Sequence, residues 1–159
     1  MAISDEDLER LRRCVELARI ALDDGDEPFG SILVDGDGVT VFEDRNRVKD
    51  GDHTRHPEIA IAHWAVDNMT PDERARATVY TSGEHCPMCA AGHAWVGLGR
   101  IVYAASSEQL SQWLRKWEAP AAPVAPLPIN TVAPGAIVDG PAPQLTDTMK
   151  ALYAAKFNS

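Results

Sequence analysis

The sequence predicts an α/β sandwich built around one mixed β-sheet. The first observation is that apolar, β-prone runs at 31–45, 77–82 and 100–106 alternate along the chain with segments of helical periodicity. The second is that only the first run is interrupted by a short turn, at 36–38, which is typical of an antiparallel hairpin. A length of 159 residues suits a single domain, 1–159, with its own buried core.

The N-terminal segment predicts an amphipathic helix. Ser4 suits the capping position, and the acidic residues that follow it suit the positive end of a helix dipole. Apolar residues then recur at helical spacing as far as Gly25, namely Leu8, Leu11, Val15, Ala18 and Leu22. The hairpin at 31–45 comes directly after this helix.

Two further helices are predicted to begin at prolines. Pro57 follows His56 after a polar loop, and Pro87 follows Cys86 after the second strand region. Proline suits the first position of a helix because its missing N–H would be unpaired there in any case. His56 and Cys86 are therefore expected at two helix entrances.

The C-terminal third is predicted to hold two helices separated by a segment rich in proline and alanine. Trp113 and Trp117 lie on one face of the first of these helices and are expected to pack against the core. The expected elements are a helix at 107–118 capped at Ser106 or Ser107, the Pro/Ala-rich segment 119–143 with short strands at 129–132 and 136–138, and a helix at 144–157.

Composition excludes several classes of protein. No apolar run is long enough to span a membrane, and the acidic N-terminus differs from a secretory signal, so we expect a cytoplasmic protein with no membrane partner. Three cysteines do not imply a disulfide framework, and Cys14 is expected to be buried. A net charge of −9 disfavours nucleic acid as a partner and favours a small, neutral ligand.

The stretch GEHCPMCAAGHAW, residues 83–95, places Cys86 and Cys89 on one face of a helix entrance, where the thiolate form is favoured. Such a pair alone is compatible with a metal site, a redox couple or a structural role. A catalytic zinc needs three protein ligands and an open position, and His56 can supply the missing ligand. Glu58, two residues later, completes the pattern H-x-E followed by P-C-x-x-C, which is the signature of zinc-dependent deaminases.

In these motifs the chain resembles the cytidine and deoxycytidylate deaminase family, from about Pro28 to Ala105. The segments PFG at 28–30, DHTRHPE at 52–58 and YTSGEHCPMCAAG from residue 80, together with Asn46, are similar to the branch that holds guanine deaminase and the tRNA adenosine deaminases. The resemblance implies a three-layer α/β/α sandwich with a central mixed sheet of about five strands. It also implies a homodimer in which Tyr153 or Phe157 closes a site.

The activity implied by the resemblance is hydrolytic deamination of a free aminated nucleobase or analogue, with release of ammonia. Guanine-like purines are the first expectation, and an unusual base or amino-triazine is also compatible with it. A tRNA adenosine deaminase and a cytosine-type pyrimidine deaminase are the alternatives. The excess of acidic over basic residues argues against the tRNA enzyme.

The resemblance also assigns roles to individual residues. Glu58 would be the catalytic acid and base, and Zn²⁺ would be the cofactor. The expected metal ligands are His56, Cys86 and Cys89, and the expected substrate-binding residues are Phe29, Asn46, Pro57 and Trp95, of which Trp95 would close the floor of the pocket.

Three positions depart from the family pattern. Pro57 stands where the family usually has alanine, and it has no N–H to offer a bound ring. We therefore expect this protein to recognise its substrate through different contacts. His53 and His85 replace prolines of the family and are expected either to alter the loops or to contact substrate. His63 and His93 are expected to be structural, and Glu84 is expected to fix a loop or support the site.

Overall fold

A computed structural model describes residues 2–159 and contains one five-stranded mixed sheet in the order β2-β1-β3-β4-β5. β1 pairs antiparallel with both β2 and β3, whereas β3, β4 and β5 run parallel. The strands are β1 (Gly30–Val34), β2 (Thr40–Arg45), β3 (Thr78–Gly83), β4 (Ile101–Ala105) and β5 (Val138–Asp139). This sheet confirms the predicted fold class.

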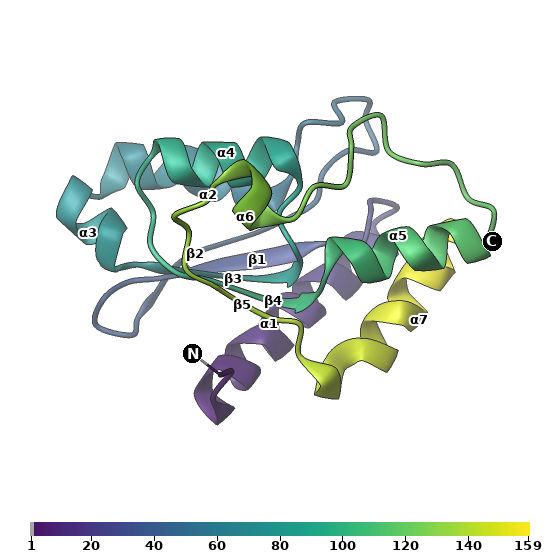
Figure 1. The fold of residues 1–159 in the computed structure, drawn as a ribbon, viewed down its shortest axis with the longest axis horizontal. Helices are drawn as coiled ribbons and strands as arrows, with labels where there is room; N and C mark the ends of the chain where they lie inside the picture. Colours follow the sequence, from purple (N-terminus) through teal and green to yellow (C-terminus); the bar gives the residue numbers. More distant parts are fainter. Residues whose placement is uncertain (1) are drawn as a thin grey trace.

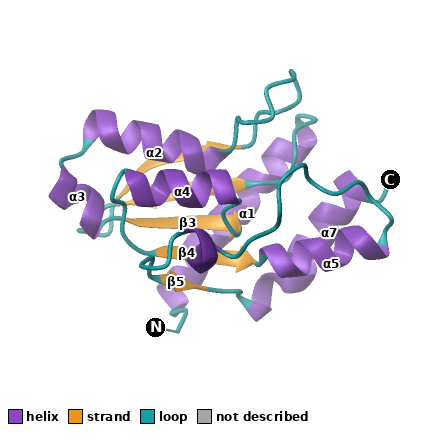
Figure 2. Ribbon diagram, turned by 45° about the horizontal axis from the view of Figure 1, so that its top comes forward, coloured by secondary structure: helices purple, strands orange, loops and turns teal. Residues whose placement is uncertain are grey.

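Helices cover both faces of the sheet and make it the middle layer of three (Figure 1). The helices are α1 (Asp5–Asp23), α2 (Pro57–Asn68), α3 (Pro71–Arg76), α4 (Pro87–Trp95), α5 (Ser107–Lys116), α6 (Ile129–Val132), the 3₁₀ turn η1 (Pro143–Leu145) and α7 (Thr146–Phe157). One face is covered by α1 and α7, with α5 beside α7, and the other face by α2 and α4 (Figures 1 and 2). No helix within 2–159 is both long and apolar enough to cross a membrane.

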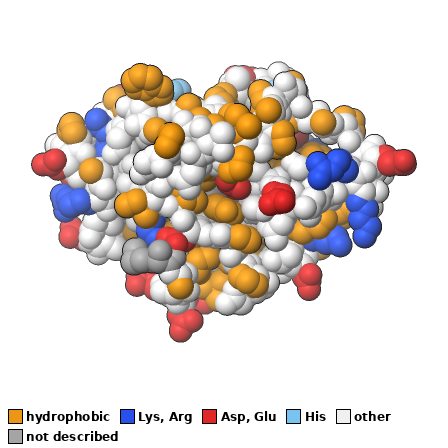
Figure 3. All heavy atoms as spheres, viewed as in Figure 1, with side chains coloured by type: hydrophobic (Ala, Val, Ile, Leu, Met, Phe, Trp, Pro, Cys, Tyr) orange, Lys and Arg blue, Asp and Glu red, His pale blue; other side chains and the backbone are white. Residues whose placement is uncertain are grey.

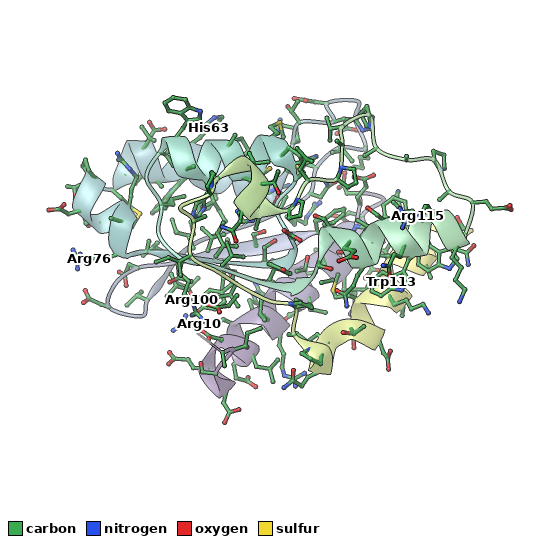
Figure 4. All side chains as sticks on the ribbon, in the orientation of Figure 1. Arg10, His63, Arg76, Arg100, Trp113 and Arg115 are labelled. Carbon is green, nitrogen blue, oxygen red and sulfur yellow. The ribbon has the colours of Figure 1, made fainter. Side chains whose placement is uncertain are left out.

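Alternating residues of the central strands divide the core between the two faces. Ile32 and Tyr80 pack with α1 and α7, whereas Leu33 and Val79 pack with α2. Gly30 lets α1 lie directly on β1, because a Cβ there would come within 2.5 Å of the Cys14 carbonyl oxygen. Figure 4 shows Trp113 beneath α5 on the side of α7, where its ring lies 5.9 Å from that of Tyr153, in agreement with the predicted packing role.

The predicted helix starts are confirmed. Ser4 caps α1 in a reciprocal arrangement with Asp7: its hydroxyl accepts from the Asp7 N–H, and its own N–H donates to the Asp7 carboxylate. Pro57 and Pro87 are the first residues of α2 and α4, and Ser106 caps α5. The starts of α2 and α4 position the candidate site.

Two local predictions were wrong. Residues 129–132 form the short helix α6 and not a strand, because Pro128 fixes the entry and Ile129 is buried, with its N–H bonded to Glu84. The proposed strand at 136–138 is reduced to the two-residue β5. Helix α3 was not predicted, although Thr70 and Glu73 form a capping box at its start.

A buried ionic cluster fastens α1 to the sheet. The Arg100 guanidinium donates two hydrogen bonds to the Asp7 carboxylate, at 2.9 and 3.0 Å, and a third to Asp139 at 2.9 Å. The Tyr80 hydroxyl donates to Asp7 at 2.7 Å. Burial acts to raise the pKa of Asp7, but the bonds from Arg100, Ser4 and Tyr80 outweigh it and hold that pKa well below its usual value.

Candidate metal centre and active site

The entrances of α2 and α4 bring two parts of the sequence together. The two helices lie side by side on one face of the sheet (Figure 2). His56 and Cys86 occupy the equivalent capping positions, both with extended backbone, and neither side chain makes the usual capping hydrogen bond. Both side chains lie at the helix entrances, where a ligand can reach them.

His56, Cys86 and Cys89 form a compact group of ligand atoms. The Nδ1 atom of His56 lies 3.5 Å from the Sγ of Cys86 and 3.6 Å from the Sγ of Cys89. All three ligand atoms lie within 4.8 Å of one another. One imidazole and two thiolates at this spacing fit a tetrahedral zinc with the fourth position open to solvent or substrate.

The electrostatics of the group favour a bound cation. The pKa of the Cys86 thiol is lowered to about 4, mainly by the hydrogen bond between Cys86 and the Cys89 side chain. Contact with Cys86 raises the pKa of His56 to about 9. The hydrogen bond between the two cysteines, together with burial, raises the pKa of the Cys89 thiol. Negative charge is thus favoured on the sulfur of Cys86, and a bound cation would stabilise the thiolate form of both cysteines.

Glu58 is buried beside this group. It is the second residue of α2, and its side chain is only 6% exposed. Its Oε1 atom lies 2.9 Å from the Ser31 hydroxyl and 3.1 Å from the Thr81 hydroxyl. Burial is the main cause that raises the pKa of Glu58. A carboxyl group with a raised pKa next to a metal site is suited to receive and return a proton.

Asn46 directly follows β2 and is 1% exposed. Its side-chain oxygen accepts hydrogen bonds from the backbone N–H groups of Glu27 and Val48, both at 3.2 Å. These two donors fix the orientation of the amide. Within 2–159 its Nδ2 donates no hydrogen bond to the protein. The amide nitrogen is therefore available to an acceptor on a ligand.

Phe29 and Tyr153 form an aromatic pair between the start of β1 and α7, with ring centroids 5.6 Å apart. A Cβ at Gly83 would lie 2.7 Å from the Tyr153 hydroxyl oxygen and 3.2 Å from the Phe29 ring. The pair therefore packs directly on the backbone that leads to Cys86. Tyr153 reaches this position from α7, and burial, with a smaller contribution from the charge of Glu58, raises the pKa of its hydroxyl group.

The expectation that Trp95 closes the floor of the pocket was wrong. Trp95 is the last residue of α4 and is 87% exposed. It lies six residues beyond Cys89, which turns it about 240° around the helix axis and about 9 Å along it. It therefore points away from the face of α4 that carries the cysteines.

The other histidines occupy different environments. His85 is 1% exposed and makes an edge contact with His93, at a centroid distance of 5.4 Å, so it packs inside the protein. His93 bonds the Gly99 carbonyl oxygen, which agrees with its predicted structural role. His53 is exposed. His63 is also exposed, on α2 (Figure 4), and lines a cavity of about 340 Å³ beside His56.

Glu84 fixes two later segments to the end of β3. Its carboxylate accepts from the N–H of Ser107 and from the N–H of Ile129, both at 2.9 Å. These bonds hold the starts of α5 and α6, so the predicted loop-fixing role is confirmed. Glu84 also lines a second cavity of about 340 Å³ with Glu108 and Arg115.

Two residues that contact Glu58, Ser31 and Thr81, were not predicted from the sequence. Ser31 lies in the mainly apolar strand β1, and Thr81 lies in β3 between Tyr80 and Ser82. Their polar side chains occupy inward-facing strand positions, and a buried hydroxyl needs a hydrogen-bond partner. This pattern could have indicated them from the sequence.

The profile of a known protein family covers the residues of the candidate site. The profile of the cytidine and deoxycytidylate deaminase zinc-binding region matches residues 4–105. This region holds His56, Glu58, Cys86 and Cys89. It excludes α5, α7 and the Pro/Ala-rich segment.

Two curated relatives and one solved structure illustrate the similarity. A probable cytosine deaminase of Schizosaccharomyces pombe is 36% identical over 116 residues, which cover 72% of this chain and 69% of the relative. Guanine deaminase of Bacillus subtilis is 33% identical over 97 residues, 60% of this chain and 62% of the relative. The structure of a guanine deaminase from Nitrosomonas europaea superposes with a TM-score of 0.71 and 20% identity, covering 98% of this chain and 85% of that one.

Proposed function

Because the chain belongs to the cytidine and deoxycytidylate deaminase family, whose members are zinc-type hydrolytic deaminases, we propose that its substrate is a free aminated nucleobase, guanine-like purines first. The observation that carries the proposal is the buried carboxylate of Glu58 beside the His56–Cys86–Cys89 group. Both curated relatives described above are named for deaminating free bases, which supports a small heterocycle as the substrate.

The proposed reaction replaces an exocyclic amine of the ring by oxygen and releases ammonia. His56, Cys86 and Cys89 would hold the zinc, which would lower the pKa of a water molecule to about 7 and so supply a nucleophile near neutral pH. Glu58 would take a proton from the attacking water and deliver protons to the ring nitrogen and the departing amine. A C–O bond forms as the C–N bond breaks, and one carboxylate serves both proton transfers.

The remaining proposed contacts hold the ring. The Nδ2 atom of Asn46 would donate to an acceptor on the base, which is supported by the two backbone N–H groups that fix the amide through its oxygen. Phe29 and Tyr153 supply an apolar wall, and Tyr153 comes from α7, outside the region matched by the family. Pro57 has no N–H, so a contact that a different residue would make to the ring is absent here.

A panel of free bases tests the substrate class. Zinc-loaded protein is incubated with guanine, cytosine, adenine, amino-triazines and the matching nucleosides, and ammonia is measured. We expect turnover of at least one free base, zinc bound at one ion per chain, and loss of that zinc in Cys89→Ser. Absence of ammonia from every free base with zinc fully bound would contradict the proposal.

Cytosine is the second candidate, since the S. pombe relative covers more of this chain than the guanine deaminase does. The same panel separates the two by comparing kcat/KM. Pro57→Ala then tests whether residue 57, at the start of α2, contributes to the choice of base. We expect this substitution to change the ranking of the bases, and an unchanged ranking would remove Pro57 from the specificity determinants.

A tRNA substrate is disfavoured by charge. The chain has 15 Lys and Arg against 24 Asp and Glu. On the face in Figure 3 the basic side chains lie in separate groups at opposite sides, and no basic stripe connects them. We expect no tRNA binding at 0.1 M salt. Binding to an anticodon stem that weakens steeply with added salt would favour the RNA-editing alternative.

We also propose a homodimer, on the basis of the family resemblance and of one exposed side chain. Trp95 is 87% exposed, and a tryptophan with this exposure at a helix end is typical of interaction surfaces. Sedimentation of the parent and of Trp95→Ser tests this. We expect a dimer that weakens in the variant, and a parent that is monomeric at micromolar concentration would contradict the proposal.

A further inference from the structure

Two buried hydroxyl groups lie next to Glu58 on the central strands. Ser31 of β1 and Thr81 of β3 are direct partners in the antiparallel register, and both are completely buried. Adjacent residues of a strand point to opposite faces. Ser31 and Thr81 therefore share the α2 side of the sheet with Leu33 and Val79.

The hydroxyls converge on one oxygen of the carboxylate. Both contact Oε1 of Glu58, Ser31 at 2.9 Å and Thr81 at 3.1 Å. They also contact each other at 2.8 Å, and the Thr81 hydroxyl lies 2.9 Å from the carbonyl oxygen of Gly83. Neither hydroxyl contacts Oε2, the second oxygen of the carboxyl group.

The other side of Glu58 faces the metal group. The Cys89 thiol lies within hydrogen-bonding reach of the Glu58 carboxyl, and His56 and Cys86 interact with it electrostatically. One side of the carboxyl is thus tied to the sheet and the other borders the ligand atoms. Two contacts to the same oxygen restrict rotation about the terminal bond of the side chain, which otherwise has a broad torsional range.

We propose that Ser31 and Thr81 are positioning residues that hold Oε1 of Glu58 against the sheet, so that Oε2 is presented to the substrate. This assignment rests on the proposed role of Glu58 in proton transfer. Misplacement of a reacting group by about 1 Å can cost on the order of a hundred-fold in rate. A pair of strand side chains is a rigid support for such a group.

Hydroxyl groups suit this task because Glu58 alternates between two forms. Each hydroxyl can donate to a carboxylate and can also accept from a carboxylic acid. When Glu58 carries the transferred proton on Oε2, Oε1 can still accept from the Ser31 and Thr81 hydroxyls, so the same contacts hold the side chain in both forms. A Lys or Arg partner would hold only the ionised form.

The test uses Ser31→Ala, Thr81→Val and their combination, with Thr81→Ser as the conservative variant and Ser82→Ala as the matched control. Ser82 is equally buried on β3, but its hydroxyl oxygen accepts from the Gly30 N–H and does not contact Glu58. We expect kcat to fall about ten-fold in each single variant and about a hundred-fold in the pair, with KM and zinc content unchanged. Thr81→Ser should recover most of the activity, and Ser82→Ala should keep kcat within about two-fold.

Glu58→Gln, measured in parallel, separates this inference from the proposed function. Full activity of Glu58→Gln would contradict the role of Glu58 itself. Loss of activity in Glu58→Gln with retained kcat in Ser31→Ala/Thr81→Val would overturn only the positioning role. Crystal structures of the zinc-loaded parent and double variant give a readout that needs no substrate. The Glu58 carboxyl should change orientation in the double variant, and an unmoved carboxyl would also overturn the assignment.

Discussion

Asp7 and Glu58 are two buried carboxylates on opposite faces of the sheet, and their surroundings shift their pKa values in opposite directions. Neighbouring residues of β3 contact them: Tyr80 donates to Asp7 on the α1 side, and Thr81 contacts Glu58 on the α2 side. Asp7 is paired with the Arg100 guanidinium, and its pKa is lowered. Glu58 has hydroxyl partners and no guanidinium, and its pKa is raised, mainly by burial.

The difference separates a stabilising carboxylate from one suited to chemistry. A buried carboxylate paired with arginine stays ionised and holds elements together. A buried carboxylate that is left without such a partner keeps its proton more readily, which makes it a candidate acid and base. Substitutions on the two sides of the sheet should therefore affect different measurements, stability on the Asp7 side and turnover on the Glu58 side.

The largest effect is expected for Glu58→Gln. The amide keeps the size of the side chain and cannot carry protons, so we expect kcat to fall by about 10³-fold. Thermal unfolding of the zinc-loaded variant should occur at the same temperature as the parent or higher, because a buried acid without an arginine partner is removed. Ammonia release and calorimetry measure the two quantities. A variant with lower stability and normal turnover would reverse the comparison.

The next effect is expected for Arg100→Met, on stability. It leaves Asp7 and Asp139 without the guanidinium that bonds both, and breaking such a buried pair costs about 3 kcal/mol or more of unfolding free energy. Urea unfolding measures this. Arg12→Met is the control, since Arg12 and Glu9 are both largely exposed and an exposed pair contributes little. Turnover per folded molecule should stay normal in both variants.

The metal ligands and Glu58 could be predicted from the sequence, whereas the residues that contact Glu58 from the sheet could not. His56 and Cys86 each precede a proline that begins a helix, and this local signal fixes both positions on the chain. The pairing of Ser31 with Thr81 depends on the register between strands 50 residues apart, which no local pattern specifies. Arg100 and Asp7 meet for the same reason only in the folded chain.

The errors also have physical causes. Trp95 was assigned to the pocket by the family resemblance, but its place around and along α4 leaves it exposed. The segment 129–132 has β-prone residues, yet the bond from the Ile129 N–H to Glu84 and the preceding proline start a helical turn there. Helix geometry explains the first case, and a tertiary contact explains the second.

Acid should weaken the Asp7 side selectively. The pKa of Asp7 is lower in the folded protein than the unfolded value of about 3.9, so its contribution is complete above that value and is lost as pH falls towards the folded pKa. The loss should be on the order of 2 kcal/mol. Unfolding free energies of the parent and Asp7→Asn between pH 6 and about pH 2 measure it. Asp7→Asn should be less stable at pH 6, and the difference should shrink in acid. An equal difference at every pH would contradict the assignment.

The smallest effect is expected for Tyr80→Phe. Loss of its 2.7 Å hydrogen bond to Asp7 should lower the unfolding free energy by about 1 kcal/mol and leave kcat unchanged. Thr81→Val, one residue away, should do the reverse and lower kcat with a smaller change in stability. Measuring both variants by urea unfolding and ammonia release compares the two faces of one strand directly. A fall in kcat for Tyr80→Phe would show that the faces are coupled.

Gly83 has a consequence for engineering this protein. A single methyl group at this position would meet the hydroxyl of Tyr153 and the ring of Phe29. Tyr153 is buried, and its ring contacts with Phe29, Trp113 and Phe157 restrict how far the side chain can move. In a library randomised at this codon and selected for activity, glycine should therefore dominate the survivors. Attempts to reshape the substrate range would find more freedom by varying the aromatic residues than by varying the backbone on which they rest.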